Sequence, residues 1–287
     1  MTAQRTLAVT LGLLLVLPGL AKAQYNFTPI DAPGGSNTAV NGNSANAIAG
    51  QFDDADGNTH GFVLDVDGFT QVDVPGATFT SVNGINASGE LAGIYVDAMG
   101  HFHGFFLSHG VFTTLDVPGS IRTVAFFLNA QDQVVGTYRD ATNTRHGFLW
   151  SKGVYTTFSE PNAAAPGGTS AIGINDRGQI VGTYVDAAGD RHGYLMDKGV
   201  YTTLDVPAAS DFTVAQGINN AGQIAGLYHD ELGVSHGFVL SNGVYTTVDV
   251  PNSIWTEIYS INAQGQIVGA YQDANGVQHG FVGTPAR

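Results

Sequence analysis

The chain has 287 residues, no cysteine, and 24 acidic against 10 basic residues, which gives a formal net charge of −14. Without cysteine it cannot form a disulfide, a thiolate nucleophile or a cysteine-ligated metal site. The acidic balance argues against nucleic acid as a partner, because a polyanion needs a basic face. Hydrophobic residues make up 43% of the chain, which is enough for a packed core.

The first 23 residues have the features of a signal peptide. Arg5 gives a positive start, residues 7–20 form an apolar run too short to span a membrane, and small residues precede position 24. We predict cleavage after Ala23, so that residues 24–287 form one secreted or periplasmic domain without membrane insertion. Eight basic against 24 acidic residues then give the mature chain a formal charge of −16.

The rest of the chain repeats one unit six times, at a spacing of 43 to 46 residues. Each copy carries a His-Gly pair, with an Asp six residues, a Gly ten residues and an Asn seventeen residues before the His. Four columns kept in register over six copies define a repeat protein. The His column is His60, His103, His146, His192, His236 and His279. The Asp column is Asp54, Asp97, Asp140, Asp186, Asp230 and Asp273.

Each unit predicts four short strands. In the fifth copy they are expected at 212–219, 222–230, 235–243 and 244–251. An Asp-x-x-Gly turn joins the second strand to the third, a turn ending in Gly joins the third to the fourth, and Pro ends the fourth. No segment has a helical period. Four antiparallel strands per unit of this length is typical of a β-propeller blade.

The two ends of the mature chain predict how the ring closes. The last copy lacks a fourth strand, whereas residues 25–33 read as a fourth strand with no copy before it. Asp31 in this segment matches Asp249 of the fifth copy. We therefore expect an all-β, six-bladed propeller of four-stranded antiparallel blades, closed by the N-terminal strand pairing in the last blade. The predicted blades are residues 34–75, 76–118, 119–161, 162–207, 208–251, and 252–287 together with 24–33.

The units at 174–207 and 218–251 resemble the bacterial repeats of the HAF family, which are described as extracellular repeats. The resemblance rests on the His-Gly-Phe or His-Gly-Tyr step in its repeat context, and it covers nearly all of the mature chain. It implies export and a repeated β fold. The family carries no assigned reaction or ligand, so no catalytic residue is transferred. The third copy departs from the pattern at Asn143, at Ser159 and Glu160, and in the longer link 163–168.

The repeated His and Asp residues are predicted to be structural. Six equivalent His on six blades diverge, whereas a metal ion needs ligands that converge in one small volume. We expect each His to bond an Asn or Asp side chain or a backbone carbonyl, and each Asp to form its turn. Catalysis needs one asymmetric constellation, so departures from the repeat are the better place to look for function.

Three such departures stand out. Seven of the eight mature cations lie between residues 122 and 198, which predicts a cationic sector for an anionic sugar, with Arg122 and Arg139 as candidates. The acidic remainder would suit calcium or a basic partner, and surface drift is the simpler explanation of both. Phe126, Phe127, Trp150, Trp255 and Tyr259 are aromatics outside the repeat columns. Of these, Trp150 and Trp255 are candidates for stacking on sugar rings, with burial in the core as the alternative.

The third departure is in the first copy, where Asp54, Asp56 and Asn58 alternate as in part of a calcium loop. The Gly is misplaced for an EF-hand and no bidentate Glu follows, so an ordinary hairpin turn is the better explanation of the pattern. We expect no cofactor, with calcium as the one alternative.

We predict a non-enzymatic binding or scaffold propeller whose partner is a carbohydrate or a protein. The alternative is a secreted polysaccharide hydrolase or lyase with carboxylates at the channel mouth. Its candidate acids cannot be paired from the sequence, and no catalytic residue is assigned. These acids are Glu90, Asp132, Asp176, Glu231 and Glu257. The third interpretation is that the protein is a purely structural component of a matrix.

Overall fold

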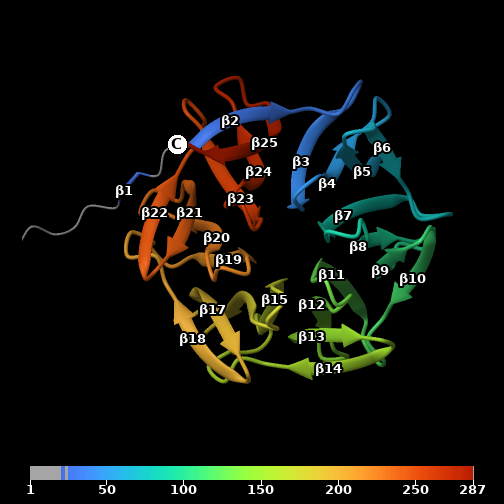
Figure 1. Ribbon diagram of the computed structural model, residues 1–287. Helices are drawn as coiled ribbons and strands as arrows, with labels where there is room; N and C mark the ends of the chain where they lie inside the picture. Colours follow the sequence, from blue (N-terminus) through green and yellow to red (C-terminus); the bar gives the residue numbers. More distant parts are fainter. Residues whose placement is uncertain (1–20, 23–24, 287) are drawn as a thin grey trace, which may run out of the picture.

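The computed structural model describes residues 21–22 and 25–286, and within them the chain forms strands and turns but no helix. Six sheets stand around a central axis like the blades of a propeller (Figure 1). The predicted six-bladed propeller of four-stranded antiparallel blades is confirmed. The predicted signal peptide, residues 1–23, lies outside the described residues except for positions 21 and 22.

The blades follow one another in chain order. The first contains β3 (Ser36–Asn43), β4 (Ile48–Asp53), β5 (Thr59–Asp65) and β6 (Gly68–Val72). The second contains β7 (Phe79–Ile85), β8 (Leu91–Val96), β9 (Phe102–Ser108) and β10 (Val111–Leu115). The third contains β11 (Arg122–Leu128), β12 (Val134–Arg139), β13 (Arg145–Ser151) and β14 (Val154–Phe158). The fourth contains β15 (Thr169–Ile174), β16 (Ile180–Val185), β17 (Arg191–Asp197) and β18 (Val200–Leu204). The fifth contains β19 (Thr213–Ile218), β20 (Ile224–His229), β21 (Ser235–Ser241) and β22 (Val244–Val248).

The sixth blade is made from both ends of the chain. It contains β23 (Trp255–Ile261), β24 (Ile267–Gln272) and β25 (Gln278–Pro285), and its fourth strand is β2 (Tyr25–Ile30). β2 pairs antiparallel with β25 over its whole length, from Tyr25 opposite Pro285 to Ile30 opposite Gly280. Figure 1 shows the blue N-terminal strand beside the red C-terminal one. Closure by the N-terminal strand is therefore confirmed. A further short strand, β1 (Ala21–Lys22), pairs parallel with β22.

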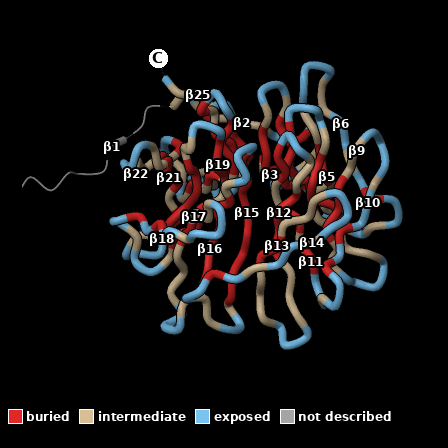
Figure 2. The backbone as a smooth tube through the Cα atoms, turned by 60° about the horizontal axis from the view of Figure 1, so that its bottom comes forward, coloured by how far each residue is buried: buried red, intermediate tan, exposed pale blue. Residues whose placement is uncertain are grey.

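The blades pack through two glycine columns and one aromatic column. Phe105 is fully buried and lies opposite Gly93 on the neighbouring strand, where a Cβ would collide with the Phe105 ring and the backbone oxygen of Ser81. Gly104 allows the next blade to approach, because a Cβ there would lie 3.1 Å from Cβ of Ala125. The same aromatic position is fully buried in every blade, at Phe62, Phe105, Phe148, Tyr194, Phe238 and Phe281. Figure 2 shows the buried residues along the strands and the exposed ones in the loops at both ends.

Two polar columns tie successive blades together. In five blades the side-chain oxygen of the buried Asn after the inner strand accepts a backbone N–H of the following turn, and its amide donates to the next blade, as that of Asn129 does to the backbone oxygen of Asn175 at 3.2 Å. The exception is Asn43 of the first blade, whose amide donates to the backbone oxygen of Gln266 in the preceding, sixth blade at 2.9 Å. The sequence columns did not include the second set, a buried Thr near the start of each inner strand. Its hydroxyl accepts a backbone N–H from the incoming link, as Thr123 does from Val117 at 3.1 Å. These six threonines are Thr38, Thr80, Thr123, Thr169, Thr213 and Thr256.

The one tyrosine in the buried aromatic column gives a stability prediction. The Tyr194 hydroxyl is buried and has no hydrogen-bond partner among the described residues, so it carries an uncompensated desolvation cost. We expect Tyr194→Phe to raise the free energy of unfolding by about 1 kcal/mol, measured by urea denaturation. Tyr184→Phe is the control, because the Tyr184 hydroxyl lies 3.2 Å from that of Thr203, and its loss should cost about 0.5–1.5 kcal/mol. A destabilised Tyr194→Phe would contradict this account.

Candidate functional site

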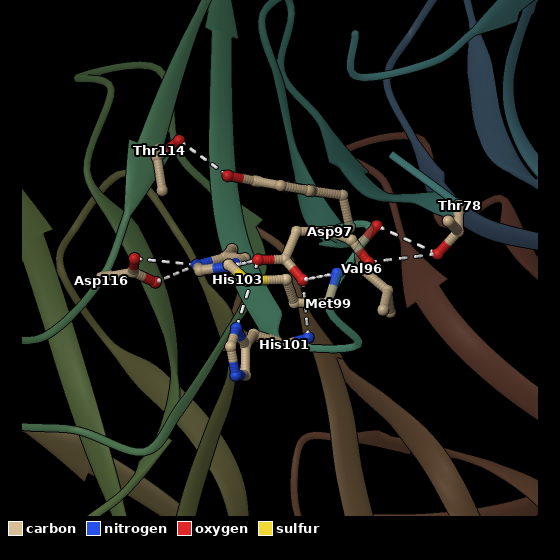
Figure 3. Close-up of polar contacts among 9 residues, drawn as sticks. Thr78, Val96, Asp97, Met99, His101, His103, Thr114 and Asp116 are labelled. Atoms are coloured by element: carbon tan, nitrogen blue, oxygen red, sulfur yellow. Dashed lines mark hydrogen bonds and ion pairs between the residues drawn. The ribbon is translucent and has the colours of Figure 1, made fainter. Parts of the chain in front are cut away.

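Each repeated His lies between two side chains at the edge of its blade. In the second blade (Figure 3), Nδ1 of His103 donates to the carboxylate of Asp116 at 2.9 Å, while Nε2 faces Oδ2 of Asp97 at 3.5 Å. The ring also stacks on Tyr95, with 4.9 Å between centroids. The imidazole thus links the turn between the second and third strands to the end of the fourth strand.

The same arrangement occurs in all six blades. The partner of Nδ1 lies thirteen residues after the His in five blades, and in the sixth it comes from the N-terminal segment. These partners are Asp73, Asp116, Ser159, Asp205, Asp249 and Asp31. The six His sit on six separate blades and do not converge on one site. Their structural role stays a prediction, and this geometry is what such a role requires.

The neighbouring carboxylates raise the pKa of two of these histidines, His60 and His192. Partial burial opposes the charged form of His192, but hydrogen bonds and charges from Asp205 and Asp186 outweigh it and raise the pKa of His192. The pKa of His60 is raised for the same combination of reasons, with Asp54 and Asp73 as the carboxylates. A histidine whose pKa is raised on folding stabilises the folded state most at low pH, where its imidazole is charged.

The arginines that depart from the repeat pattern lie together elsewhere, in the third blade. Arg122 on β11, Arg139 at the end of β12 and Arg145 at the start of β13 are direct cross-strand neighbours in the third blade. All three line a cavity of about 300 Å³ between the second, third and fourth blades. The sequence named Arg122 and Arg139 as candidates, and the structure brings them together and adds Arg145. The sequence did not reveal the strand register that makes these three arginines neighbours.

This cavity is strongly cationic. Like charges directly opposite one another in a sheet are destabilising. Among the described residues, no carboxylate lies within ion-pairing distance of these guanidinium groups. Burial and the charges of Arg139, Arg191 and Arg122 lower the pKa of Arg145 to about 10, so it still carries its charge at neutral pH. The positive charges are therefore concentrated without a counter-charge from the protein.

The partners of the arginines are uncharged. The Arg122 guanidinium lies 3.8 Å from the ring centre of Phe102, and Arg139 donates to the backbone oxygen of Asn143 at 2.7 Å. Arg145 donates to the Ser170 hydroxyl at 3.5 Å. These contacts hold the side chains but leave most of their N–H donors free for a ligand.

The cavity has an apolar wall and two hydroxyl groups besides the arginines. Ile94, Val124, Phe126 and Tyr138 supply the apolar surface, so one of the unmatched aromatics of the sequence, Phe126, belongs to the site. The Thr137 hydroxyl has no hydrogen-bond partner among the described residues. A concave apolar wall with a few convergent polar groups is typical of small-ligand sites.

The two tryptophan candidates do not line this cavity. Trp150 on β13 packs on Phe106, with 5.4 Å between ring centroids, and belongs to the core between the second and third blades. Trp255 at the start of β23 is half-buried and donates its indole N–H to Oε1 of Gln272 at 3.1 Å. Phe127 and Tyr259 pack against an apolar cluster around Ile172, Val214 and Leu227.

The suggested calcium ligands form a hairpin turn between β4 and β5. Oδ1 of Asp54 accepts the backbone N–H groups of Asp56 and Asn58, at 2.9 and 2.8 Å. Oδ2 accepts the Asn58 amide at 3.0 Å and faces Nε2 of His60 at 3.1 Å. Hydrogen bonds from Asn58 hold the pKa of Asp54 well below its usual range. The turn thus uses both carboxylate oxygens itself, and calcium binding here stays an untested prediction.

Of the candidate acids, the structure brings two together. Glu90 and Asp132 share the amide of Asn86, at 2.6 and 3.3 Å. The hydrogen bond from Asn86 lowers the pKa of Glu90, whereas burial and the proximity of Glu90 raise that of Asp132. Asp132 precedes β12 and Arg139 ends it, so this pair lies at the opposite end of the blade from the arginines.

The other three candidate acids are separate from this pair. Asp176 lines a pocket of about 230 Å³ at the channel mouth formed by the Asn ring, and its carboxylate accepts the backbone N–H of Ala130 at 2.9 Å. Glu257 accepts the Tyr259 hydroxyl at 2.8 Å. Glu231 is exposed in the turn between β20 and β21.

No family model matches the chain, and no curated protein matches it either. Several solved structures do match the chain. Aleuria aurantia lectin in complex with α-methyl-L-fucoside is 12% identical, with a TM-score of 0.54 over 87% of this chain and 93% of that one. SapL1 lectin in complex with α-methyl fucoside is 15% identical, with a TM-score of 0.57 over 88% and 97%. TolB from Acinetobacter baumannii is 12% identical, with a TM-score of 0.57 over 85% and 65%. At these identities the similarity shows the fold alone.

The described residues contain no helix long and apolar enough to cross a membrane.

The histidine geometry predicts a pH-dependent contribution to stability. Because the folded-state pKa of His192 is raised, its contribution is full below its unfolded pKa and is lost as pH rises through the folded value. We expect His192→Ala to lower the free energy of unfolding at pH 6 by about 1–3 kcal/mol and to flatten the fall in stability between pH 6 and 8. Urea denaturation across this pH range measures both effects.

His146→Ala is the matched comparison. Nδ1 of His146 faces the Ser159 hydroxyl at 2.8 Å instead of a second carboxylate, so its loss should cost less than that of His192. An unchanged stability of His192→Ala, together with loss of a ligand, would reject the structural role.

Proposed function

We propose that the protein is an exported, non-enzymatic propeller of the HAF-repeat kind that binds a carbohydrate carrying an anionic group. The binding site in this proposal is the arginine-lined cavity of the third blade. The observation that carries it is the convergence of Arg122, Arg139 and Arg145 on a cavity of about 300 Å³ without a carboxylate partner.

A carboxylate or sulfate group fits this charge arrangement. Three neighbouring guanidinium groups repel one another, and an anion among them would relieve that repulsion while accepting several N–H groups at once. The surrounding chain is strongly acidic, so the cavity is a local positive site on an otherwise negative molecule. A polymer of uniform negative charge would be repelled by the rest of the surface, which favours a short anionic segment or a chain end as the ligand.

The sugar part of the ligand is supported by the walls of the cavity. Phe126 and Tyr138 offer apolar surface for the C–H face of a sugar ring, while Ser170 and Thr137 offer hydroxyl groups for its polar edge. Two of the similar solved propellers, Aleuria aurantia lectin and SapL1 lectin, are complexes with a methyl fucoside. These neighbours support carbohydrate as the ligand class, and the arginines support an acidic rather than a neutral sugar.

A second candidate, hydrolysis or elimination on a polysaccharide, is favoured by one observation. Glu90 and Asp132 are neighbouring carboxyl groups whose pKa values are shifted in opposite directions, which is the pattern of an acid and a base. Their position at the far end of the blade from the arginines separates them from the cavity where we place the ligand. Binding without turnover is therefore the primary proposal.

Calorimetric titration with an oligogalacturonate tests the proposal, and its methyl ester is the matched neutral ligand. We expect the acid form to bind and the ester to bind at least tenfold more weakly. Arg145→Ala should weaken binding of the acid form by about 10- to 100-fold, since it removes a charge-assisted contact. Arg177→Ala, an exposed arginine in a turn at the other end of its blade, should leave binding unchanged.

The other outcomes separate the alternatives. Equal binding of acid and ester, or of α-methyl-L-fucoside alone, would reject the anionic ligand. Unchanged binding in Arg145→Ala would reject the cavity as the site. Release of reducing or unsaturated ends, lost in Asp132→Asn, would instead establish the enzymatic alternative.

A further inference from the structure

We propose that the second blade also carries a binding site for a transition metal ion of the zinc class, formed by Asp97, His101 and His103. One nitrogen of each imidazole and one carboxylate oxygen all lie within 4.8 Å of one another. Two imidazoles and one carboxylate are a common set of zinc ligands, whereas calcium and magnesium prefer oxygen alone. Figure 3 shows the three side chains directed toward one another at the turn between β8 and β9.

The separations of the ligand atoms fit an ion of this size. Oδ2 of Asp97 lies 3.3 Å from Nδ1 of His101 and 3.5 Å from Nε2 of His103. Ligand atoms bound at 2.0–2.2 Å to a tetrahedral ion are about 3.3–3.6 Å apart. An ion can thus replace the contacts among these atoms with little movement of the side chains.

The surroundings already orient the ligands. Nδ1 of His103 donates to Asp116, which leaves Nε2 for the metal, and a carboxylate behind a metal-binding His is a usual supporting contact. The other oxygen of Asp97 accepts the backbone N–H groups of His101 and Met99, at 2.8 and 2.9 Å. Oδ2 of Asp97 is thereby left directed toward the two imidazoles.

The site is specific to one blade. All six blades hold the Asp and His pair, but only the second has a His at the fourth position after the Asp. The residues at that position in the other blades are Asn58, Thr144, Asp190, Val234 and Val277. Among the described residues, no other blade brings three ligand atoms of His, Asp or Glu side chains within 4.8 Å of one another, although Asp190 occupies this position in the fourth blade. The repeated scaffold thus supplies two ligands everywhere, and His101 completes the set once.

The site is accessible from solvent. The His101 side chain is 62% exposed, and the site borders a cavity of about 590 Å³ that also contains Arg122. Three protein ligands leave at least one coordination position for water or for an oxygen of a bound molecule. The proposal does not depend on carbohydrate binding, and it is tested without any sugar.

Calorimetric titration of the chelator-treated mature chain with zinc chloride at pH 7.5 tests this site. We expect one zinc ion to bind per chain. His101→Ala should weaken zinc binding at least 10- to 100-fold, as losses around metal sites do. Its melting temperature without metal should be unchanged, since the side chain is largely exposed. His109→Asn, at an exposed His elsewhere in the same blade, is the control and should bind zinc normally.

A gain of binding provides the converse test. Val234→His places a third ligand beside Asp230 and His236 in the fifth blade, and we expect this variant to bind two zinc ions per chain. Wild-type protein that binds no zinc, or His101→Ala that binds as wild type does, would overturn the proposal. Calcium binding as tight as that of zinc would show an unspecific acidic site and would overturn it equally.

Discussion

The packing of the ring depends on two glycine columns, one that makes room for the aromatic ring of its own blade and one that faces the next blade. At Gly93 the ring of Phe105 occupies the space a side chain would need, and at Gly104 the next blade comes within van der Waals reach. This spacing brings the inner strands close enough for the buried Asn and Thr side chains to bond across the gaps. Dispersion contacts and buried hydrogen bonds therefore reinforce each other in every blade.

Much of this architecture could be predicted because it is periodic. Residues that recur at a fixed spacing indicate the strands, their turns and the number of blades. The unmatched segment around Asp31 indicates where the ring closes. The partner of each His was also readable, since an Asp or a Ser stands thirteen residues after five of the six. The Thr column likewise stands six residues before the Asn in five copies, and only its physical role needed coordinates.

The candidate sites were harder to predict because they depend on register. Arg122, Arg139 and Arg145 are spread over 24 positions of sequence, and only the pairing of three strands makes them neighbours. Trp150 was indistinguishable in the sequence from a ligand-stacking residue, but it packs between two blades. His101 was missed because its position varies from copy to copy, and only the fixed ring orientation of His103 shows that the two imidazoles lie together. The calcium pattern at Asp54 and the cluster around His101 occur in different copies of the repeat.

The asymmetric features are concentrated in one sector of the ring. Arg122 borders both the arginine-lined cavity and the cavity beside His101, so the proposed anion and metal sites share one wall. The six-fold elements, in contrast, are distributed evenly and have the contacts of a scaffold. In a repeat of this kind, the residues that stabilise the ring are distinct from the residues that can vary in a single blade.

The pairing of β2 with β25 places the two ends of the described chain side by side, with Tyr25 opposite Pro285. A short linker would span these ends, and new termini could then open in any exposed hairpin without breaking a sheet. The order of blades around the axis is thus independent of where the polypeptide starts. Circularly permuted chains of this protein should assemble the same ring. A comparison of chains whose new termini split different blades would show which blade closes last during folding.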